Sequence, residues 1–198
     1  MKNFALHSRW TIIAAVLALF ASFSQAQTTT WNLDSAHSAV EFSVRHLGLS
    51  NVHGHFGKVA GSISLNSADI TKSTVNATID VTGVDTGNEA RETHLKSPDF
   101  FDVANFASAT FVSTSVQKNG AGLTVNGNLT LRGVTKPVVL AIDTLGAPIT
   151  SPMDKKQHVG YEATTTISRT AFGIGSKFPD AIVSDAIKIT IEVEAIQQ

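Results

Sequence analysis

The sequence predicts an all-β protein, an eight-stranded antiparallel barrel with one short helix. Three observations lead to this fold class. Apolar and polar residues alternate with a period of two along most of the chain after residue 36. One face of each such segment is rich in Thr, Asn and charged residues, whereas the other is apolar, which is typical of antiparallel sheets with one solvated face. Turn-forming residues separate the segments, so the strands are joined in hairpins.

The eight predicted strands are long, and most connections between them are short. Long one-sided strands favour an up-and-down barrel, which closes its own edges, and a two-sheet sandwich is the alternative. The last strand has the clearest alternation, and the segments Asn66–Asp69 and Lys118–Gly120 predict turns. In chain order the strands cover residues 40–46, 59–65, 74–81, 107–117, 123–132, 138–142, 159–167 and 187–195.

The connection between the third and fourth predicted strands has a helical pattern. Thr86 and Glu89 have the spacing of a capping box, which predicts a short polar helix as far as Lys96, ended by Ser97 and Pro98. Three phenylalanines follow in the same connection: Phe100, Phe101 and Phe106. They either plug one end of the barrel as core residues or line the mouth of a ligand site.

The first 26 residues have the pattern of a cleaved secretory signal. Lys2 and Arg9 precede an apolar stretch from Trp10 to Phe23, which is too short to span a bilayer, and Ser24–Ala26 supplies small residues for cleavage. An uncleaved membrane anchor is the alternative. Residues 27–198 then form a single exported domain, in the periplasm or secreted. The chain has no cysteine, so we expect neither disulfides nor a lipoprotein anchor.

Charge and motif content exclude several function classes. The whole chain has 15 Lys and Arg against 16 Asp and Glu without a basic cluster, which argues against nucleic acid or an anionic membrane surface as partner. No nucleophile elbow, phosphate-binding loop, dinucleotide fingerprint or zinc-protease motif occurs, so we predict no catalysis and no cofactor. His53 and His55 share one side of an extended segment and could chelate a metal ion. Because a third ligand with defined spacing is missing, we predict no metal site.

The interior of such a barrel is either filled by side chains or holds one elongated ligand. Gly61, Ala77, Gly127 and Ala163 place small residues at inward positions, which favours a cavity. A ligand that hides about 500 Å² of apolar surface would gain roughly 12 kcal/mol before costs. Ordering of the ligand and loss of its free motion would cancel about half of that gain.

Five separated blocks of the sequence point to a known family. They are Asp34–His46, Gly54–Phe56 with Gly61–Ile63, Asp85–Asp102, Gly127–Val138 and Ile167–Ile174. Together they span most of residues 30–195 and resemble, in this order, the YceI-like family. The family often has a proline and a tyrosine near Asn105–Ala107, which are absent here, and this difference concerns a turn more than a pocket.

The resemblance implies a lipocalin-like barrel, usually periplasmic and often dimeric, that binds polyisoprenoids or related amphiphiles and has no assigned catalytic residue. From this and the inward alternation we expect storage or transport of an isoprenoid-like lipid. A lipid-modifying enzyme and a non-catalytic stress or interaction protein with a filled barrel are the rivals.

The predicted ligand contacts fall into three groups. Apolar contacts come from Phe42, Val44, Phe56, Ile63, Ile79, Phe111, Leu129 and Leu131. Phe100, Phe101, Phe106 and Phe172 close or line the mouth. Polar candidates for the head group are His46, Arg91, His94 and Arg169. For His46 the alternative is a hydrogen-bonded rim residue, and for Arg91 and His94 it is simple exposure to solvent.

Overall fold

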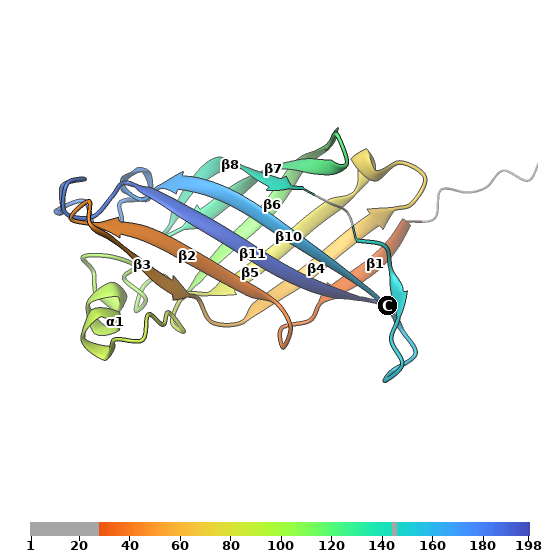
Figure 1. The fold of residues 1–198 in the computed structure, drawn as a ribbon, viewed down its shortest axis with the longest axis horizontal. Helices are drawn as coiled ribbons and strands as arrows, with labels where there is room; N and C mark the ends of the chain where they lie inside the picture. The colour runs from red at the N-terminus through yellow and green to blue at the C-terminus, as the bar shows by residue number, and fades with distance from the viewer. Residues whose placement is uncertain (1–27, 144–145) are drawn as a thin grey trace, which may run out of the picture.

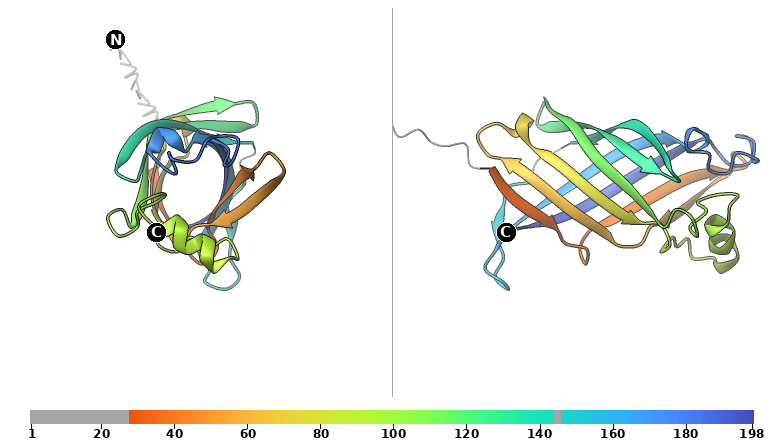
Figure 2. Two further views of the ribbon diagram at one scale, coloured as in Figure 1. Left: turned by 90° about the vertical axis from the view of Figure 1, so that its left-hand side faces the viewer. Right: turned by 180° about the vertical axis from the view of Figure 1, so that it is seen from behind.

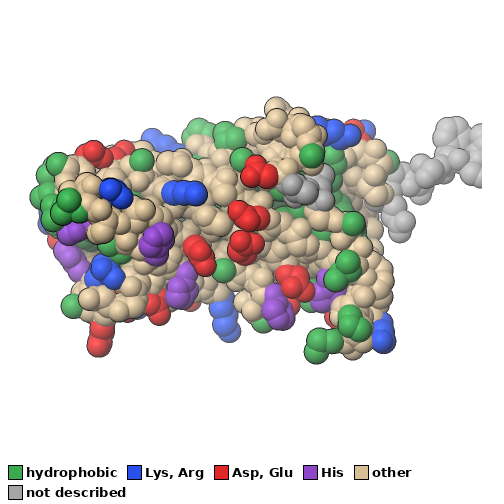
Figure 3. Space-filling view, in the orientation of Figure 1, with side chains coloured by type: hydrophobic (Ala, Val, Ile, Leu, Met, Phe, Trp, Pro, Cys, Tyr) green, Lys and Arg blue, Asp and Glu red, His purple; other side chains and the backbone are tan. Residues whose placement is uncertain are grey.

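The structure, a computed structural model, describes residues 28–143 and 146–198 and confirms the predicted fold class. It is an elongated, closed antiparallel barrel of eight strands (Figures 1 and 2). The predicted secretory signal, residues 1–26, lies outside the described residues. On the face shown in Figure 3, Asp, Glu and His side chains lie along the middle of the outer wall, as the alternation requires when the apolar face points inward.

Eight strands form the ring, and β11 closes it. Its register with β10 runs from His158↔Ile196 to Ser168↔Ala186, and on its other side it pairs with β1 from Trp31↔Gln197 to Leu33↔Ala195. In spatial order the ring contains β1 (Thr28–Leu33), β4 (Val59–Asn66), β5 (Thr74–Asp80), β6 (Ser108–Asn119), β7 (Gly122–Leu131), β8 (Val134–Ile142), β10 (Gln157–Ser168) and β11 (Ala186–Gln197).

Three further strands extend this ring. β2 (Ala39–His46) continues β1 after a turn and pairs with the first half of β11, and β3 (Ser50–His55) folds back on β2. The short β9 (Ile149–Thr150) pairs with the start of β10. The sequence prediction omitted β1, β3 and β9, because Thr28–Leu33 has only two large apolar residues and the other two segments are mostly polar or very short.

The single α-helix within the described residues, α1 (Glu89–Lys96), lies at one end of the barrel (Figures 1 and 2). Its last residue is the one predicted, but its N-cap is Asn88 and not Thr86. The Asn88 side chain accepts from the backbone N–H of Arg91, and Glu92 Oε1 accepts from the N–H groups of Asn88 and Thr86. Two 3₁₀ turns, η1 (Ile70–Lys72) and η2 (Thr170–Phe172), complete the elements. No helix of the described residues is long and apolar enough to cross a membrane.

Two hydrophobic clusters form the core of the barrel. A small one, Trp31, Ile63, Val159 and Ala195, lies where β1, β10 and β11 meet near the C-terminus. The larger cluster extends from there to the α1 end and includes Phe100 and Phe101. The inner face of the barrel is apolar except at Tyr161, Thr165 and Arg169.

The four small inward residues have two different roles. Ala77 and Ala163 line the open interior, as predicted. Gly127 does not leave space: a Cβ atom built on it would lie 2.3 Å from Cζ of Phe111, so the phenylalanine ring occupies the position of the missing side chain. Gly61 has a φ of +148°, and a Cβ atom there would lie 2.1 Å from the backbone oxygen of Asn76.

We therefore expect Gly127→Ala to destabilise the protein by about 1–3 kcal/mol, because the buried Phe111 ring must move. The same substitution at Gly160 is the matched control, since the nearest atom to its added Cβ is Val193 O at 3.7 Å. Gly160→Ala should leave stability unchanged or raise it by up to about 1 kcal/mol. Urea denaturation of the three proteins measures both effects, and equal midpoints would contradict the assignment of Gly127.

Candidate functional site

The barrel encloses a cavity of about 200 Å³. All eight barrel strands and β2 contribute inward side chains to it. The wall is apolar apart from three residues: Tyr161, Thr165 and Arg169. An apolar interior that extends along a closed barrel favours a ligand with a long hydrocarbon chain.

All eight residues predicted as apolar contacts line this cavity. They are Phe42, Val44, Phe56, Ile63, Ile79, Phe111, Leu129 and Leu131. Phe56 links two neighbouring rings at the α1 end, with centroid distances of 5.3 Å to Phe42 and 5.4 Å to Phe101. Their position is thus established, whereas their contact with a ligand stays a prediction.

The four phenylalanines predicted at the mouth separate into three places. Phe100 and Phe101 are buried and line the cavity, so they both plug the α1 end and form part of the wall. Phe106 packs on the turn at Gly133, away from the cavity. Phe172 is 2 % exposed and lines a separate groove on the outer surface of the barrel.

Three of the four polar candidates do not line the cavity. His46 is exposed at the end of β2. Arg91 donates from Nε and Nη2 to the side chain and backbone oxygens of Thr86, at 2.9 and 2.8 Å, and so supports the start of α1. His94 is exposed and packs edge-on against Phe100, with 5.0 Å between ring centroids.

Arg169 lies on the cavity wall, but its hydrogen-bonding capacity is fully used. It is 3 % exposed, and its Nε, Nη1 and Nη2 atoms donate to backbone carbonyl oxygens at 2.6–3.1 Å. A guanidinium has five N–H donors, and here five carbonyls accept them. The acceptors belong to Ile174, Gly175, Phe178, Val183 and Ser184. Arg169 therefore folds the connection between β10 and β11 over the α1 end and has no donor left for a head group.

The sequence prediction missed several residues of the wall. Leu95, from α1, and Ile174 and Val183, both from the connection between β10 and β11, close the α1 end. Leu95 could have been found, because it is the one large apolar residue of a polar helix. Tyr161 and Thr165 occupy inward positions of the alternation in β10, and no hydrogen bond joins either hydroxyl to another of the described residues. Burial raises the pKa of Tyr161, which keeps its hydroxyl neutral.

Comparison with known proteins places this barrel in a family. A model described as a YceI-like domain matches residues 31–195. This chain belongs to the YceI-like family. The Protein YceI of Salmonella arizonae is 38 % identical over 165 residues, which cover 83 % of this chain and 84 % of that protein.

Two solved structures show how far the likeness extends. The Campylobacter jejuni YceI protein is 30 % identical with a TM-score of 0.69, and the match covers 78 % of this chain and 90 % of that one. A polyisoprenoid-binding domain from Saccharophagus degradans, implicated in plant cell wall breakdown, has a TM-score of 0.60. That match covers 87 % of this chain and all of the other, but at 16 % identity it shows the fold alone.

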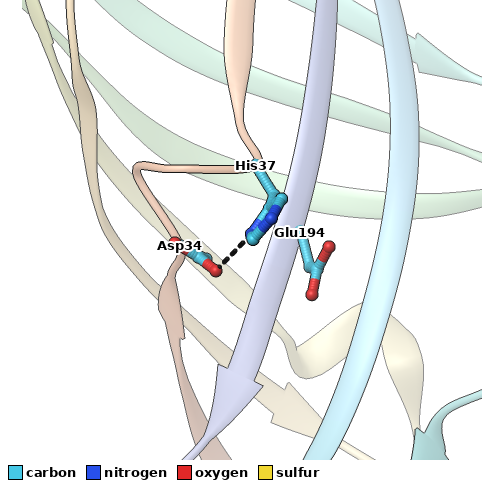
Figure 4. A group of neighbouring side chains, drawn as sticks. All are labelled: Asp34, His37 and Glu194. Carbon is cyan, nitrogen blue, oxygen red and sulfur yellow. Dashed lines mark hydrogen bonds and ion pairs between the residues drawn. The ribbon is translucent and has the colours of Figure 1, made fainter. Parts of the chain in front are cut away.

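A cluster of polar residues in this YceI-like domain lies outside the cavity. Atoms of Asp34, His37 and Glu194 that can bind a metal lie within 4.8 Å of one another (Figure 4). Asp34 Oδ2 and His37 Nδ1 are 2.8 Å apart, and this hydrogen bond is the main cause that lowers the pKa of Asp34 and raises that of His37. These are ligand types for zinc, but zinc bonds of about 2.0–2.2 Å would have to replace that hydrogen bond. His53 and His55 lie on β3, exposed and apart from this group.

His158 extends the same cluster on β10. Its Nδ1 is 2.6 Å from Glu194 Oε1 and its Nε2 is 3.1 Å from Asp154 Oδ2. These hydrogen bonds, the one to Glu194 first, raise the pKa of His158. The backbone N–H of Lys156, and then His158, lower the pKa of Asp154 to about 2.

The raised pKa of His158 and the lowered pKa of Asp154 predict the pH range in which their interaction stabilises the fold. The contribution of His158 is complete below its unfolded pKa of about 6.5 and disappears as the pH rises through its higher folded pKa. The contribution of Asp154 to stability is present above about pH 4 and disappears as the pH falls toward 2. His158→Gln should therefore lower the melting temperature most near pH 5 and least near pH 9. His53→Gln is the exposed control, and a decrease independent of pH would contradict the ionic contribution of His158.

Replacement of Arg169 by Lys tests its role in the β10–β11 connection. Lysine has three donors without the planar fork, so at least two of the five carbonyls lose their partner. We expect a loss of about 2–4 kcal/mol in unfolding free energy and faster hydrogen exchange in residues 170–184. Arg45→Lys, at an exposed position on β2, is the control. Unchanged exchange in residues 170–184 would show that Arg169 does not hold this connection.

Proposed function

We propose that this YceI-like domain binds one long apolar or amphiphilic lipid of the isoprenoid class inside the barrel and stores or carries it without chemical change. The observation that carries the proposal is the apolar cavity that runs inside a closed barrel. A filled barrel, the rival from the sequence, would leave no such space. The apolar walls supply the free energy of binding, and its size depends on the area of ligand that they cover.

The wall chemistry also favours binding over catalysis. Proton transfer or nucleophilic attack requires a positioned acid, base or nucleophile near the reacting bond. The cavity wall has two hydroxyls and one arginine, and that arginine is saturated by carbonyls. Tyr161 and Thr165 are thus the groups to which a ligand's polar end can hydrogen-bond inside the barrel.

Two further observations support the ligand class and the compartment. The Saccharophagus degradans domain that shares this fold is described as polyisoprenoid-binding. The first 26 residues have the pattern of a secretory signal, which supports a periplasmic setting.

Homodimer formation is part of the same proposal, and native mass spectrometry measures oligomeric state and bound lipid together.

The test is native mass spectrometry of the protein purified from its own periplasm, followed by extraction and fragmentation of the bound species. A discrete bound mass that fragments as an isoprenoid is the expected result. A bare protein mass that stays unchanged after incubation with quinones and polyprenyl lipids would sink the proposal.

Substitution of two neighbouring residues on β7 tests whether the lipid lies inside the barrel. Leu129 lines the cavity, whereas Asn128 is exposed on the outer face. Leu129→Glu puts a charge, which costs several kcal/mol to desolvate, against the hydrocarbon chain and should abolish uptake, and Asn128→Glu should not. Because a buried charge can also unfold the barrel, Ala163→Leu serves as a second variant that reduces the cavity without a charge. Full uptake by a folded Leu129→Glu and by Ala163→Leu would place the ligand elsewhere.

A further inference from the structure

The barrel wall has one weakly paired seam, between β8 and β10. Among the described residues, their register contains a single pair, Thr164↔Ala141. On its other side β8 pairs with β7 along its whole length, from Leu123↔Ile142 to Leu131↔Val134. Residues 134–140 of β8 therefore have a strand partner on one side and lack a register partner in β10 on the other.

The sequence of β8 agrees with this arrangement. Pro137 lies within the strand, and proline has no N–H to donate to a ladder, so prolines in sheets are confined to edges and irregular positions. Val139 is 53 % exposed on the outer face. The first half of β8 thus behaves as a sheet edge inside a closed barrel.

A groove lies on the outer surface over this seam, between residues 136–141 and residues 164–172. Val138, Thr165 and Ile167 line this groove, and the same three residues line the interior cavity. Because these residues line both the outer groove and the interior cavity, the wall that separates the two is a single layer of residues at this seam. Buried Phe172 of η2 lines the groove as well and partly fills it.

Both ends of the barrel are more firmly closed than the seam. The cluster of Trp31, Ile63, Val159 and Ala195 packs one end. At the α1 end, opening requires the connection after β10 to move, and Arg169 holds this connection with five hydrogen bonds. Separation of β8 from β10 breaks one register pair and displaces Phe172.

One side chain crosses this seam near its α1 end. Arg132, in the turn between β7 and β8, donates to the carbonyl oxygens of Gly173 at 2.5 Å and Pro98 at 2.7 Å. Its Nε is buried without a hydrogen-bond partner among the described residues. Arg132 thus holds the start of β8 to the C-cap of η2 with one hydrogen bond and to the connection after α1 with the other, whereas Arg169 makes five.

We propose that the seam between β8 and β10 is the lateral passage through which a long apolar chain enters and leaves the cavity, with Phe172 as its plug. The inference rests on the proposed function, since it concerns the route of the same lipid. The hydrocarbon chain would lie first in the outer groove against Val138 and Ile167 and then pass between the strands.

A disulfide across the seam tests this route. The chain has no cysteine, so Ala141→Cys with Thr164→Cys gives one defined bridge. Paired residues of antiparallel strands have Cα atoms about 4.5–5.5 Å apart, within the range that a disulfide spans. Both side chains face outward, between cavity-lining neighbours, so the bridge leaves the cavity unchanged.

The control bridge joins two fully paired strands of the same barrel. Thr78 and Thr110 face outward in the continuous register between β5 and β6. Thr78→Cys with Thr110→Cys therefore adds a bridge of the same kind where no passage is proposed. Thiol titration verifies that both bridges form.

The probe is all-trans-retinol, a fluorescent isoprenoid alcohol, followed by stopped flow during uptake and release. With the seam bridge oxidised, both rates should fall by about tenfold or more, the equilibrium Kd should stay the same, and reduction should restore the rates. The control bridge should change neither rate. Phe172→Leu should have the opposite effect and accelerate both uptake and release, because leucine is smaller than the phenylalanine that plugs the seam.

The outcomes separate the two proposals. Equal rates in the oxidised and reduced seam variant, or a Phe172→Leu protein with unchanged rates, would overturn the passage and leave the binding function standing. Absence of retinol and polyprenyl lipid binding in the unaltered protein would overturn the proposed function and the passage with it.

Discussion

The structure depends on β11, the last strand, because it pairs with β1, the first strand of the barrel. It pairs with β10 on one side and with β1 and β2 on the other, so it converts a long antiparallel sheet into a closed ring. Closure satisfies backbone N–H and C=O groups that an open sheet would leave at its edges. It also turns the apolar face of every strand inward, which is why one alternation pattern produces both a polar outer wall and an apolar interior.

The ends and the wall of this barrel differ in how firmly they are closed. Arg169 is buried, and backbone carbonyl groups of its own connection accept all five of its N–H donors. This arrangement fixes the loop that covers the α1 end, because no single carbonyl can leave without a cost in the others. In the described part of the wall, β8 and β10 share the single register pair Thr164↔Ala141, and Pro137 lies within β8. Rigid ends and a weak side are consistent with a cavity that is filled through its wall.

Residue type alone is a poor guide to what a charged or small residue does in this molecule. Arg91, His94 and Arg169 have the chemistry of head-group ligands, yet Arg91 supports a helix start, His94 packs outside the cavity and Arg169 bonds to its own loop. Gly127 has the sequence position of a residue that leaves space, yet the ring of Phe111 fills that space. In each case the deciding partner is distant in sequence, so local pattern could not identify it.

The sequence by itself determined the fold class, the helix in the connection after β5 and the apolar lining of the interior, because a period of two assigns each side chain to one face of a strand. It missed the short strands β1, β3 and β9 and placed the helix cap two residues early. Only the tertiary structure decided how the ring closes, which phenylalanines reach the cavity, how Arg169 is satisfied and where the wall is weakly paired. These features depend on register between strands and on contacts across the barrel, and an alternation pattern contains no information about which strand lies beside which.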